Sequence, residues 1–439
     1  MMNRPKYLKR LVNAKWNGFP KIITGIRRCG KSYLLKEIFR THLIENGVTE
    51  KNIISLEFDD AKNAPYRNPL ELNKFILESC ADKNEQFYVF LDEIQQVYTI
   101  VNPDLTGGKI VLAKDGDTET ISFVDVVLGL SHEKNIDLYV TGSNSKMLSS
   151  DIVTEFRDKA TEIHMAPLSF SEFYEAQGGK IEKQEALYEY MQYGGMPLAV
   201  LKNADEKQEY LKGLFKTTYF KDILERNKLR KTEAMDELCT ILATCTGELL
   251  NAEKLANTFL SKRREKIDKE TVTSYINAFL DAFILSEAKR YDLKGRKFIN
   301  STRKYYFSDT GLRNARLDFV YPDEGQILEN IVYNELCYNG WSVNVGTFDS
   351  VEKENGKSVR KSYEVDFMAT KGSETIYLQI TENLSNAEVK KREVRPYILL
   401  NDQVKKIIVV NRPIKGTKDE NGFMVVGVAE FLLGLDEDK

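Results

Sequence analysis

The chain has 439 residues, of which 42% are hydrophobic and 29% charged, and a formal net charge of −3; this is the composition of an ordinary globular protein of about two to four domains. The basic N-terminus lacks an apolar segment and no run is long enough to span a bilayer, so we expect neither a signal peptide nor a membrane association. Five scattered cysteines without a CxxC pair indicate reduced thiols and a cytoplasmic protein, and three histidines argue against a histidine-based metal site or catalytic triad.

Apolar strands alternate with helical patterns through residues 1–165. This alternation predicts an α/β domain with a mainly parallel sheet and right-handed crossovers. The predicted strands are Lys21–Thr24, Asn52–Phe58, Gln86–Leu91, Asp137–Thr141 and Thr161–Met165.

The first strand runs directly into a glycine-rich turn and a helix. The stretch 22-IITGIRRCGKSYLL-35 contains Gly25-x4-Gly30-Lys31-Ser32, the complete G-x-x-x-x-G-K-[ST] pattern. Glycines let successive backbone N–H groups turn toward a phosphate, and the helix that follows offers its positive N-terminus. Lys31 would reach the β- and γ-phosphates of ATP, and the Ser32 hydroxyl would bind Mg²⁺. The residues expected to hold the nucleotide are Gly25, Cys29, Gly30, Lys31, Ser32 and Tyr33.

A pair of carboxylates ends the third strand, in 87-FYVFLDEIQQV-97. The carboxyl ends of parallel strands are where an open α/β sheet places its chemistry. We expect Asp92 to complete the Mg²⁺ site with Ser32, and Glu93 to polarise the attacking water. The alternative is that the Asp-Glu pair is only a solvated turn. Because a complete phosphate-binding motif precedes the pair in the chain, this alternative is the weaker interpretation.

Further candidates follow the fourth strand. Either Ser143 or Asn144, at the tip of 138-LYVTGSNS-145, would lie beside the two preceding sites and orient the water. Arg157 is the notable cation of the next segment, because phosphoryl transfer needs positive charge on its transition state, often supplied by a neighbouring subunit. The alternative is that Arg157 merely ends a helix. An insertion at 108–123 reads as a hairpin around an Asp-Gly pair, and is either a partner or oligomer contact or a passive loop.

The alternation of strands and helices ends after residue 165, and two other patterns follow it. Residues 166–230 are helical and contain 193-YGGMPLAV-200, whose Gly-Gly-x-Pro predicts a rigid turn between helices. Helices and then strands follow in the order of a winged helix, at Ala252–Phe259, Lys269–Ala282, Ile284–Arg290 and Lys304–Phe307.

A basic segment lies within this winged-helix pattern. Residues 261–304, with a predicted loop at 289–304, hold twelve Lys and Arg against six Asp and Glu. Clustered positive charge is an electrostatic footprint for the DNA backbone. A winged helix used for protein contacts is the alternative.

The last segment has the outline of a metal-dependent nuclease. Its helix, 325-GQILENIVYNEL-336, places Glu335 on the apolar face, where a carboxylate needs a partner. Two strands follow, 364-EVDFMAT-370 and 376-IYLQITEN-383. The first strand carries Glu364 and Asp366, and the nuclease-like set would be Glu329, Asp366 and Gln379. Such a site also needs a lysine, and Thr381 stands in its place, so we predict a degenerate site without nuclease activity.

Taken in order, several motifs resemble a family of prokaryotic ATPases that joins an AAA+-type P-loop core to a C-terminal domain called DUF4143. They are ITGIRRCGKS, VFLDEIQ, VTGSNSKMLSS, PLSFSEF, YGGMP, KYYFSDTGLRNA, GQILENIVYNEL and EVDF. The resemblance implies an ASCE-division core, a helical lid, a winged helix and a restriction-endonuclease-like domain. The corresponding predicted boundaries are 1–165, 166–230, 231–315 and 316–439.

Carried over by position, the resemblance assigns Lys31 and Ser32 to Walker A, Asp92 and Glu93 to Walker B, and Asn144 to the sensor. Arg157 falls near the arginine-finger position, although Phe-Arg-Asp stands where the family has Gly-Arg. The expected function is ATP hydrolysis with Mg²⁺, coupled to DNA or a protein partner, in a chain that also assembles into a homo-oligomer. The alternatives are a nucleotide-gated regulator with little turnover and an ATP-regulated DNA nuclease.

Overall fold

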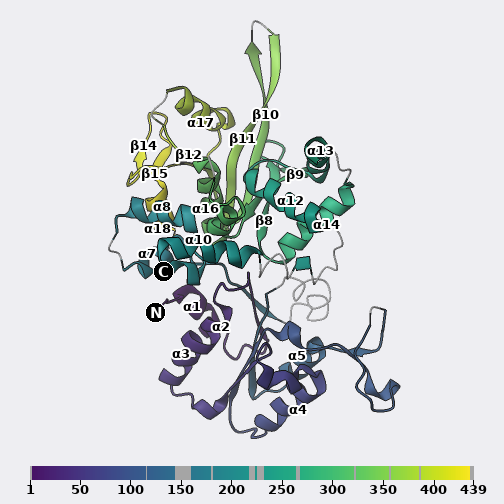
Figure 1. The fold of residues 1–439 in the computed structure, drawn as a ribbon. Coiled ribbons are helices and arrows are strands. Elements are labelled where there is room, and N and C mark those ends of the chain that lie inside the picture. The colour runs from purple at the N-terminus through teal and green to yellow at the C-terminus, as the bar shows by residue number, and fades with distance from the viewer. Residues whose placement is uncertain are drawn as a thin grey trace. The chain divides into compact units, whose positions relative to one another are not determined.

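The computed structural model describes residues 2–114, 116–143, 160–178, 181–216, 223–224, 232–263, 267–320, 323–354, 357–384 and 387–435. It divides into two compact units, Met1–Met165 and Ala166–Lys439 (Figure 1). Each unit is built around its own large β-sheet. Among the described residues, no helix combines the length and the apolar character needed to cross a bilayer.

The first unit contains a five-stranded sheet in the order β2-β3-β6-β1-β7. All neighbouring strands run parallel, which confirms the predicted α/β fold class. The strands are β1 (Lys21–Thr24), β2 (Ile53–Glu57), β3 (Phe87–Asp92), β6 (Ile136–Thr141) and β7 (Thr161–His164). Because β6 separates β1 from β3, polar residues at the end of β6 lie between the loop after β1 and the carboxyl end of β3.

Helices cover both faces of this sheet (Figure 1). On one face, α4 (Pro69–Ser79) and α5 (Phe123–Ser131) bury their apolar residues against β1, β3 and β6. On the other lie α1 (Pro5–Ala14), η1 (Leu34–Phe39) and α3 (Arg40–Glu45), where Phe39 packs with its ring centroid 4.9 Å from that of Tyr139. The short helical segments are α2 (Lys31–Tyr33), η2 (Glu50–Asn52), η3 (Ala61–Arg67), η4 (Ile94–Gln96) and η5 (Pro103–Leu105).

An arm extends away from this sheet between β4 (Ile100–Val101) and β5 (Thr120–Ile121) (Figure 1). The two strands pair antiparallel, and Leu112 forms a bridge with Ile100. The predicted 108–123 hairpin is therefore wrong in its pairing, because its first half pairs back with β4 rather than across its own Asp-Gly turn. The arm leaves Leu105, Ile110 and Leu112 more than half exposed, at 64%, 51% and 57%.

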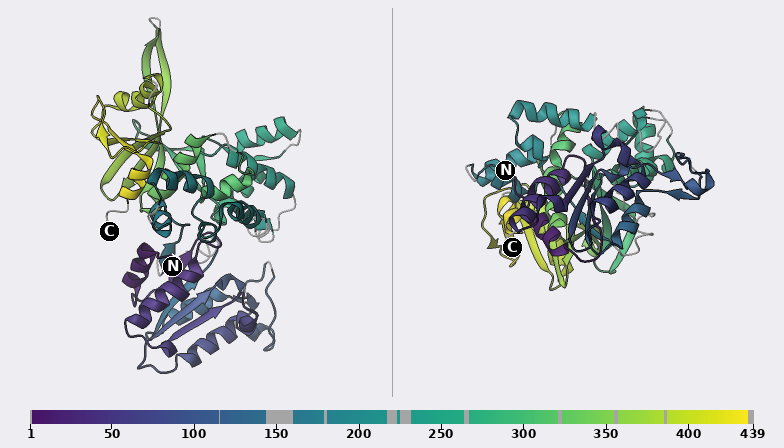
Figure 2. Two further views of the ribbon diagram at one scale, coloured as in Figure 1. Left: turned by 60° about the vertical axis from the view of Figure 1, so that its left-hand side comes forward. Right: turned by 90° about the horizontal axis from the view of Figure 1, so that it is seen from below.

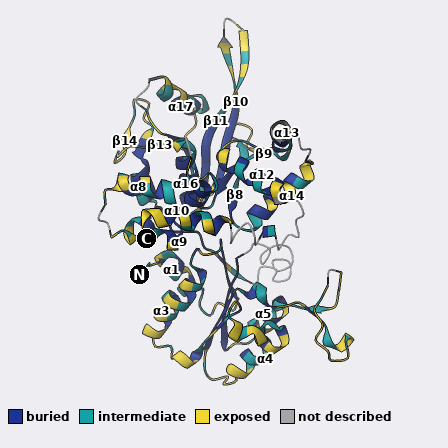
Figure 3. Cartoon of the chain, in the orientation of Figure 1, coloured by how far each residue is buried: buried dark blue, intermediate teal, exposed yellow. Residues whose placement is uncertain are grey.

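The second unit contains an eight-stranded sheet in the order β14-β15-β13-β12-β11-β10-β8-β9. Its strands are β8 (Leu285–Asp292), β9 (Lys297–Phe307), β10 (Ser342–Glu354), β11 (Lys357–Lys371), β12 (Glu374–Thr381), β13 (Lys405–Val410), β14 (Thr417–Lys418) and β15 (Met424–Gly427). The hairpin of β10 and β11 extends beyond the other strands (Figure 2) and changes along its length from buried to exposed (Figure 3).

The helices of this unit pack on both faces of its sheet. The helix α16 and its neighbours α7, α8 and α18 bury one face, and α17 buries the other. The bounds are α7 (Phe170–Ala176), α8 (Lys183–Tyr193), α9 (Pro197–Val200), α10 (Ala204–Gly213), α12 (Thr232–Thr244), α13 (Ala252–Arg263), α14 (Lys269–Asp281), α15 (Thr310–Arg316), α16 (Glu324–Tyr338), α17 (Ala387–Leu400) and α18 (Val428–Gly434). Glu335 of α16 is buried as expected, and it accepts a hydrogen bond from the Phe170 N–H at 2.5 Å and from the Tyr190 hydroxyl at 3.4 Å.

The Gly-Gly-x-Pro turn between α8 and α9 is held by a buried carboxylate. The Gly195 N–H donates to Asp309 Oδ2 at 2.6 Å, and the Leu312 N–H donates to Asp309 Oδ1 at 3.0 Å. Gly194 has φ +68°, and a Cβ at that position would lie 2.2 Å from Asp309 Oδ1. The glycines are therefore needed so that α15 can approach the turn this closely.

Helices α12, α13 and α14 precede the β8–β9 hairpin, in the order that predicted a winged helix. The predicted basic loop at 289–304 is wrong, because the two strands extend through most of it and leave only residues 293–296 as the turn. Asp292 Oδ1 stabilises this turn by accepting the N–H groups of Lys294 and Gly295 at 3.1 and 2.8 Å. β8 also pairs in parallel with β10, so the hairpin belongs to the same sheet as the C-terminal strands.

Candidate functional site

The loop between β1 and α2 begins at a position that has no room for a side chain. Gly25 has φ +144°, and a Cβ there would lie 2.1 Å from the carbonyl oxygen of Met165. Gly30 has φ +104° and is the N-cap of a helical run that continues from Lys31 to Glu45. Both backbone conformations are ones that glycine adopts without strain, and both fall on the glycines of the motif. They bend the loop into a cradle at the N-terminus of the helical run.

Lys31 points back into this cradle. Its side chain is nearly enclosed, with a residue exposure of 4%, and its Nζ donates to the carbonyl oxygens of Gly25 at 3.0 Å and Ile26 at 3.2 Å. Both of these partners are neutral carbonyl oxygens rather than carboxylates. The loop therefore presents N–H groups and one cation together, which is the donor set that a nucleotide phosphate requires.

Asp92 lies at the end of β3 and contacts residues from two other elements. The Ser32 hydroxyl donates to its Oδ1 at 2.9 Å, and the Thr141 hydroxyl at the end of β6 donates to the same oxygen at 2.5 Å. A serine hydroxyl beside a carboxylate, next to a phosphate cradle, is an oxygen ligand set that suits Mg²⁺. The structure thus brings Ser32 and Asp92 together, as the sequence motifs predicted.

A second lysine joins this site without having been predicted. Lys36 Nζ lies 3.1 Å from Asp92 Oδ2 and 2.5 Å from Glu57 Oε2 at the end of β2. Burial lowers the pKa of Lys36, but Glu57 and Asp92 outweigh this and raise the pKa above its ordinary value. The available signal was its position one helical turn after Ser32, which places both side chains on the same helix face. The pairing with Glu57 required the strand order.

Glu93 adopts a left-handed backbone conformation, with φ +56° and ψ +46°. This conformation is strained for a residue with a side chain and often occurs at functional sites. The Glu93 N–H donates to Thr141 Oγ1 at 3.0 Å, and its carboxylate accepts from the Ser143 hydroxyl at 3.3 Å and from the Gln95 amide. Ser143 in turn accepts a hydrogen bond from Arg27 Nε at 3.2 Å.

The remaining predicted nucleotide-site residues fall into two groups. Asn144 and Arg157 lie outside the described residues, and of the two candidates at the end of β6 the structure places Ser143 beside Glu93. Cys29 is fully buried with its Sγ 3.4 Å from the Met165 carbonyl oxygen, which is a packing position. Tyr33 is exposed at the start of the helical run.

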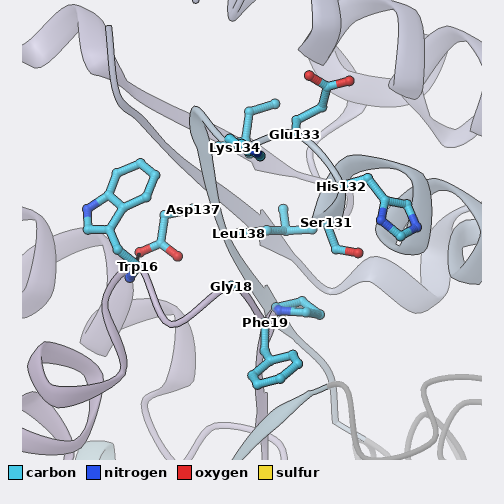
Figure 4. Close-up of a pocket in the computed structure, with 11 residues that line it drawn as sticks. Trp16, Gly18, Phe19, Ser131, His132, Glu133, Lys134, Asp137 and Leu138 are labelled. Carbon is cyan, nitrogen blue, oxygen red and sulfur yellow. Dashed lines mark hydrogen bonds between the residues drawn. The ribbon is translucent and has the colours of Figure 1, made fainter.

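A cavity of about 250 Å³ lies at the opposite end of the strands of the same sheet (Figure 4). It is lined at the beginnings of β1 and β6, whereas the P-loop follows the end of β1. Its Asp137 is already paired with Lys21 and accepts hydrogen bonds from the Trp16 N–H at 3.2 Å and the Tyr139 hydroxyl at 2.7 Å. This cavity is therefore separate from the candidate nucleotide site.

Two of the predicted nuclease-like residues in the second unit, Glu329 and Asp366, do converge, but around a lysine. Lys304 of β9 lies 2.9 Å from Glu329 Oε1 and 2.7 Å from Glu364 Oε1. Burial lowers the pKa of Lys304, and the surrounding carboxylates outweigh this and raise the pKa well above its usual range. Burial, and next the charge of Glu329, raise the pKa of Asp366. Asp366 Oδ2 accepts the N–H of Ile380 at 2.7 Å.

Gln379 lies apart from this lysine. Its amide Nε2 donates to Glu393 Oε2 at 2.8 Å on α17. Its Oε1 is buried without a hydrogen-bond partner among the described residues. Among the residues that the structure describes, no group of three or more His, Cys, Asp or Glu side chains is arranged to hold a metal ion.

The basic segment is divided by the hairpin into an inner and an outer group. Arg303 and Lys304 are paired with carboxylates, and Arg290 Nε donates to Thr347 Oγ1 at 3.0 Å. The exposed cations of the hairpin itself lie at or near the β8–β9 turn, beside a Phe298 that is 54% exposed. They are Lys289, Lys294, Arg296 and Lys297.

Two stretches of the chain match models of known protein families. Residues 17–174 match an AAA domain, and residues 184–322 match a domain of unknown function, DUF8612. The model matched in the second unit is thus not the expected DUF4143, and that resemblance stays a prediction. The AAA match spans the loop, β3 and β6, which are the elements that build the candidate site.

The proteins similar to this chain include two relatives and one solved structure. An uncharacterized protein of Haemophilus influenzae is 29% identical over 436 residues, with 99% of each chain covered. An uncharacterized protein of Methanocaldococcus jannaschii is 28% identical over 391 residues, covering 86% of this chain and 77% of the relative. The crystal structure of Cdc6p from Pyrobaculum aerophilum aligns with 75% of this chain and 94% of its own, at 12% identity and a TM-score of 0.29. A likeness this low says nothing about ligand or partner.

Proposed function

We propose that the AAA-type unit of this protein binds ATP with Mg²⁺ and hydrolyses it to ADP and phosphate. The observation that carries the proposal is the 2.9 Å hydrogen bond between Ser32 and Asp92 beside the glycine cradle. It joins the residue after the P-loop lysine to the end of β3 across β6. Hydrogen-bonded oxygens of this kind, next to a phosphate site, are what a Mg²⁺–nucleotide complex needs.

The residues present fit a nucleotide. The space that a Cβ would fill at Gly25 is closed by the Met165 carbonyl, so the loop backbone itself faces the cradle. Lys31 supplies the positive charge for the phosphates, and its carbonyl contacts are exchanged for phosphate contacts on binding. Ser32 and Asp92 would hold the Mg²⁺, which supplies charge neutralisation for the phosphates.

Glu93 is the proposed group that orients and polarises water. Its carboxylate is held by Ser143 and Gln95 and its backbone by Thr141, so its position follows the end of β6. Arg27 connects Ser143 to the P-loop itself. This chain of contacts would transmit a movement of the loop on nucleotide binding to the glutamate. Arg157 stays a proposed transition-state cation, acting within one chain or between chains of a homo-oligomer.

Coupling to DNA is the proposed use of the β8–β9 turn. Lys294, Arg296 and Lys297 are exposed at the end of a rigid hairpin, with Phe298 beside them. Exposed cations beside an apolar side chain suit a phosphate backbone. A protein partner at the same turn is the alternative occupant.

Two substitutions test the proposed hydrolysis. Lys31→Ala should abolish binding of a fluorescent ATP analogue, because the cradle loses its cation. Glu93→Gln should keep binding and stop phosphate release, because only the water-polarising carboxylate is removed. Lys51→Ala, an exposed lysine of the same unit, serves as the control and should keep both activities.

The outcome separates hydrolysis from regulation. Equal loss of binding in Lys31→Ala and Glu93→Gln would remove Glu93 from its proposed role. Tight binding without measurable turnover in the unsubstituted protein, with and without DNA, would favour the nucleotide-gated regulator. Both measurements use the full chain.

A further inference from the structure

The fold resemblance of the second unit implies a divalent cation between helix and strand carboxylates, and the residues present do not fit one. The Glu329 and Glu364 carboxylates already share Lys304, at 2.9 and 2.7 Å. The lysine side chain is only 3% exposed, so it is an interior group rather than a mobile surface cation. A buried ammonium among carboxylates supplies the positive charge that a metal would otherwise supply.

The hairpin holds this lysine in place from several directions. Lys304 lies opposite Ala288 in the β8–β9 ladder, and β8 is bonded to β10. Two residues further on the same strand face, the Tyr306 hydroxyl donates to Glu329 Oε1 at 2.5 Å. The Tyr306 ring stacks on Tyr333 of α16, with centroids 4.2 Å apart. The ammonium is therefore fixed by the sheet and by α16 together.

We propose that Lys304 is the resident cation of this carboxylate cluster, taking the place of a divalent metal and joining the β8–β9 hairpin to α16 and β11. The cluster is thus a latent cation site that the chain fills with its own side chain. Removing the ammonium leaves Glu329 and Glu364 without a cation beside Asp366, and a divalent cation then becomes the replacement. This inference concerns the second unit alone and does not depend on nucleotide hydrolysis.

Thermal unfolding of the full chain in EDTA and in MnCl₂ tests the proposal. The unsubstituted protein should have the same Tm in both for the transition of the second unit. Lys304→Met should lower that Tm in EDTA by roughly 10 °C, because breaking a buried ion pair leaves uncompensated charge. MnCl₂ should restore much of the loss. Lys289→Met, an exposed lysine on the neighbouring strand, is the matched control and should change neither value.

Double variants identify the carboxylates as the partners. Lys304→Met/Glu329→Gln removes both charges and should recover most of the lost Tm in EDTA. Lys304→Met/Asp366→Asn should lose the rescue by MnCl₂. If Lys304→Met alone does not fold, recovery in the Glu329→Gln double variant still supports the proposal, and no recovery overturns it.

Direct Mn²⁺ binding gives a second readout that needs no destabilised variant. Electron paramagnetic resonance of free Mn²⁺ compares the unsubstituted protein with Asp366→Asn, without nucleotide. Equal binding by the two proteins supports a cluster already filled by Lys304. A bound Mn²⁺ that disappears with Asp366→Asn would overturn the proposal, and so would a Lys304→Met protein as stable in EDTA as the Lys289→Met control.

Discussion

Lys36 Nζ lies 3.1 Å from Asp92 Oδ2, on the side of the carboxylate opposite the Oδ1 that accepts Ser32 and Thr141. The same ammonium reaches Glu57, so one lysine connects the helical run after the P-loop to the ends of β2 and β3. Each Asp92 oxygen therefore has its own partners. Lys36 therefore holds the Asp92 oxygen that the two hydroxyl groups leave open.

Substitution of Lys36 is expected to affect turnover more than binding. Lys36→Met removes the cation from Asp92 and Glu57, and their mutual repulsion then turns Asp92 away from Ser32. We expect kcat for ATP hydrolysis to fall by about tenfold or more, since misplaced charge at a phosphoryl-transfer site is costly. Affinity for nucleotide should change little, because the glycine cradle and Lys31 are intact. Steady-state kinetics and equilibrium binding measure the two effects.

The control for this experiment is Lys51→Met. Lys51 forms an exposed ion pair with Glu85 at 2.6 Å in the same unit, and such pairs contribute little. Lys36→Arg should retain part of the activity. An unchanged kcat in Lys36→Met would show that Asp92 is oriented without it.

Asp309 predicts a pH dependence of stability in the second unit. Burial raises its pKa to about 6, although the N–H groups of Gly195 and Leu312 act in the opposite direction. Because the folded protein holds this proton more tightly than the unfolded chain, the contribution is present below about pH 4 and is lost as the pH rises through 6. The free energy of unfolding should thus fall by about 2–3 kcal/mol over that interval on account of Asp309.

Asp309→Asn tests this pH dependence. The variant should lose the Asp309 part of the slope between pH 4 and 6, measured by denaturant unfolding at several pH values. It should also be less stable at every pH, because an amide NH₂ would face one of the two N–H groups that the carboxylate accepts. A variant with the slope of the unsubstituted protein would assign the pH dependence elsewhere.

DNA binding, if carried by the β8–β9 turn, should respond to charge reversal there. Arg296→Glu/Lys297→Glu should weaken binding of duplex DNA and reduce the slope of log K against log salt by about one for each phosphate that the variant no longer neutralises. Lys415→Glu/Lys418→Glu changes the net charge equally on exposed residues near β14 and is the control. Unchanged DNA affinity in the first variant would favour a protein partner for this turn.

The C-terminal carboxylate cluster is expected not to cut DNA. Lys304 occupies the space between Glu329 and Glu364, and Thr381 stands where a catalytic lysine would act. Loss of a transition-state charge partner lowers a rate by about a thousandfold. The assay uses duplex, branched and single-stranded DNA with Mg²⁺ and Mn²⁺. Cleavage that vanishes in Asp366→Ala would contradict the prediction and make Lys304 the candidate lysine.

Local sequence patterns predicted correctly those features that depend on neighbouring residues. The glycine spacing predicted the loop at Gly25 and Gly30, and the apolar run before Asp92 predicted the strand that presents it. Strand–helix alternation predicted the parallel sheet, because the connection between parallel strands must be long. The β8–β9 hairpin was predicted too short, since charged residues such as Lys297 and Arg303 were taken for loop.

The sequence by itself determined the glycine cradle and the class of fold, because these depend on short-range backbone preferences and on the period of apolar residues. Only the tertiary structure decided the partners of the interior charges. Lys36 meets Glu57 through the strand order, and Lys304 meets Glu364 across 60 residues of chain, through the pairing of β8 with β10. A buried charge takes whichever opposite charge the packing brings near, and no local pattern encodes that choice.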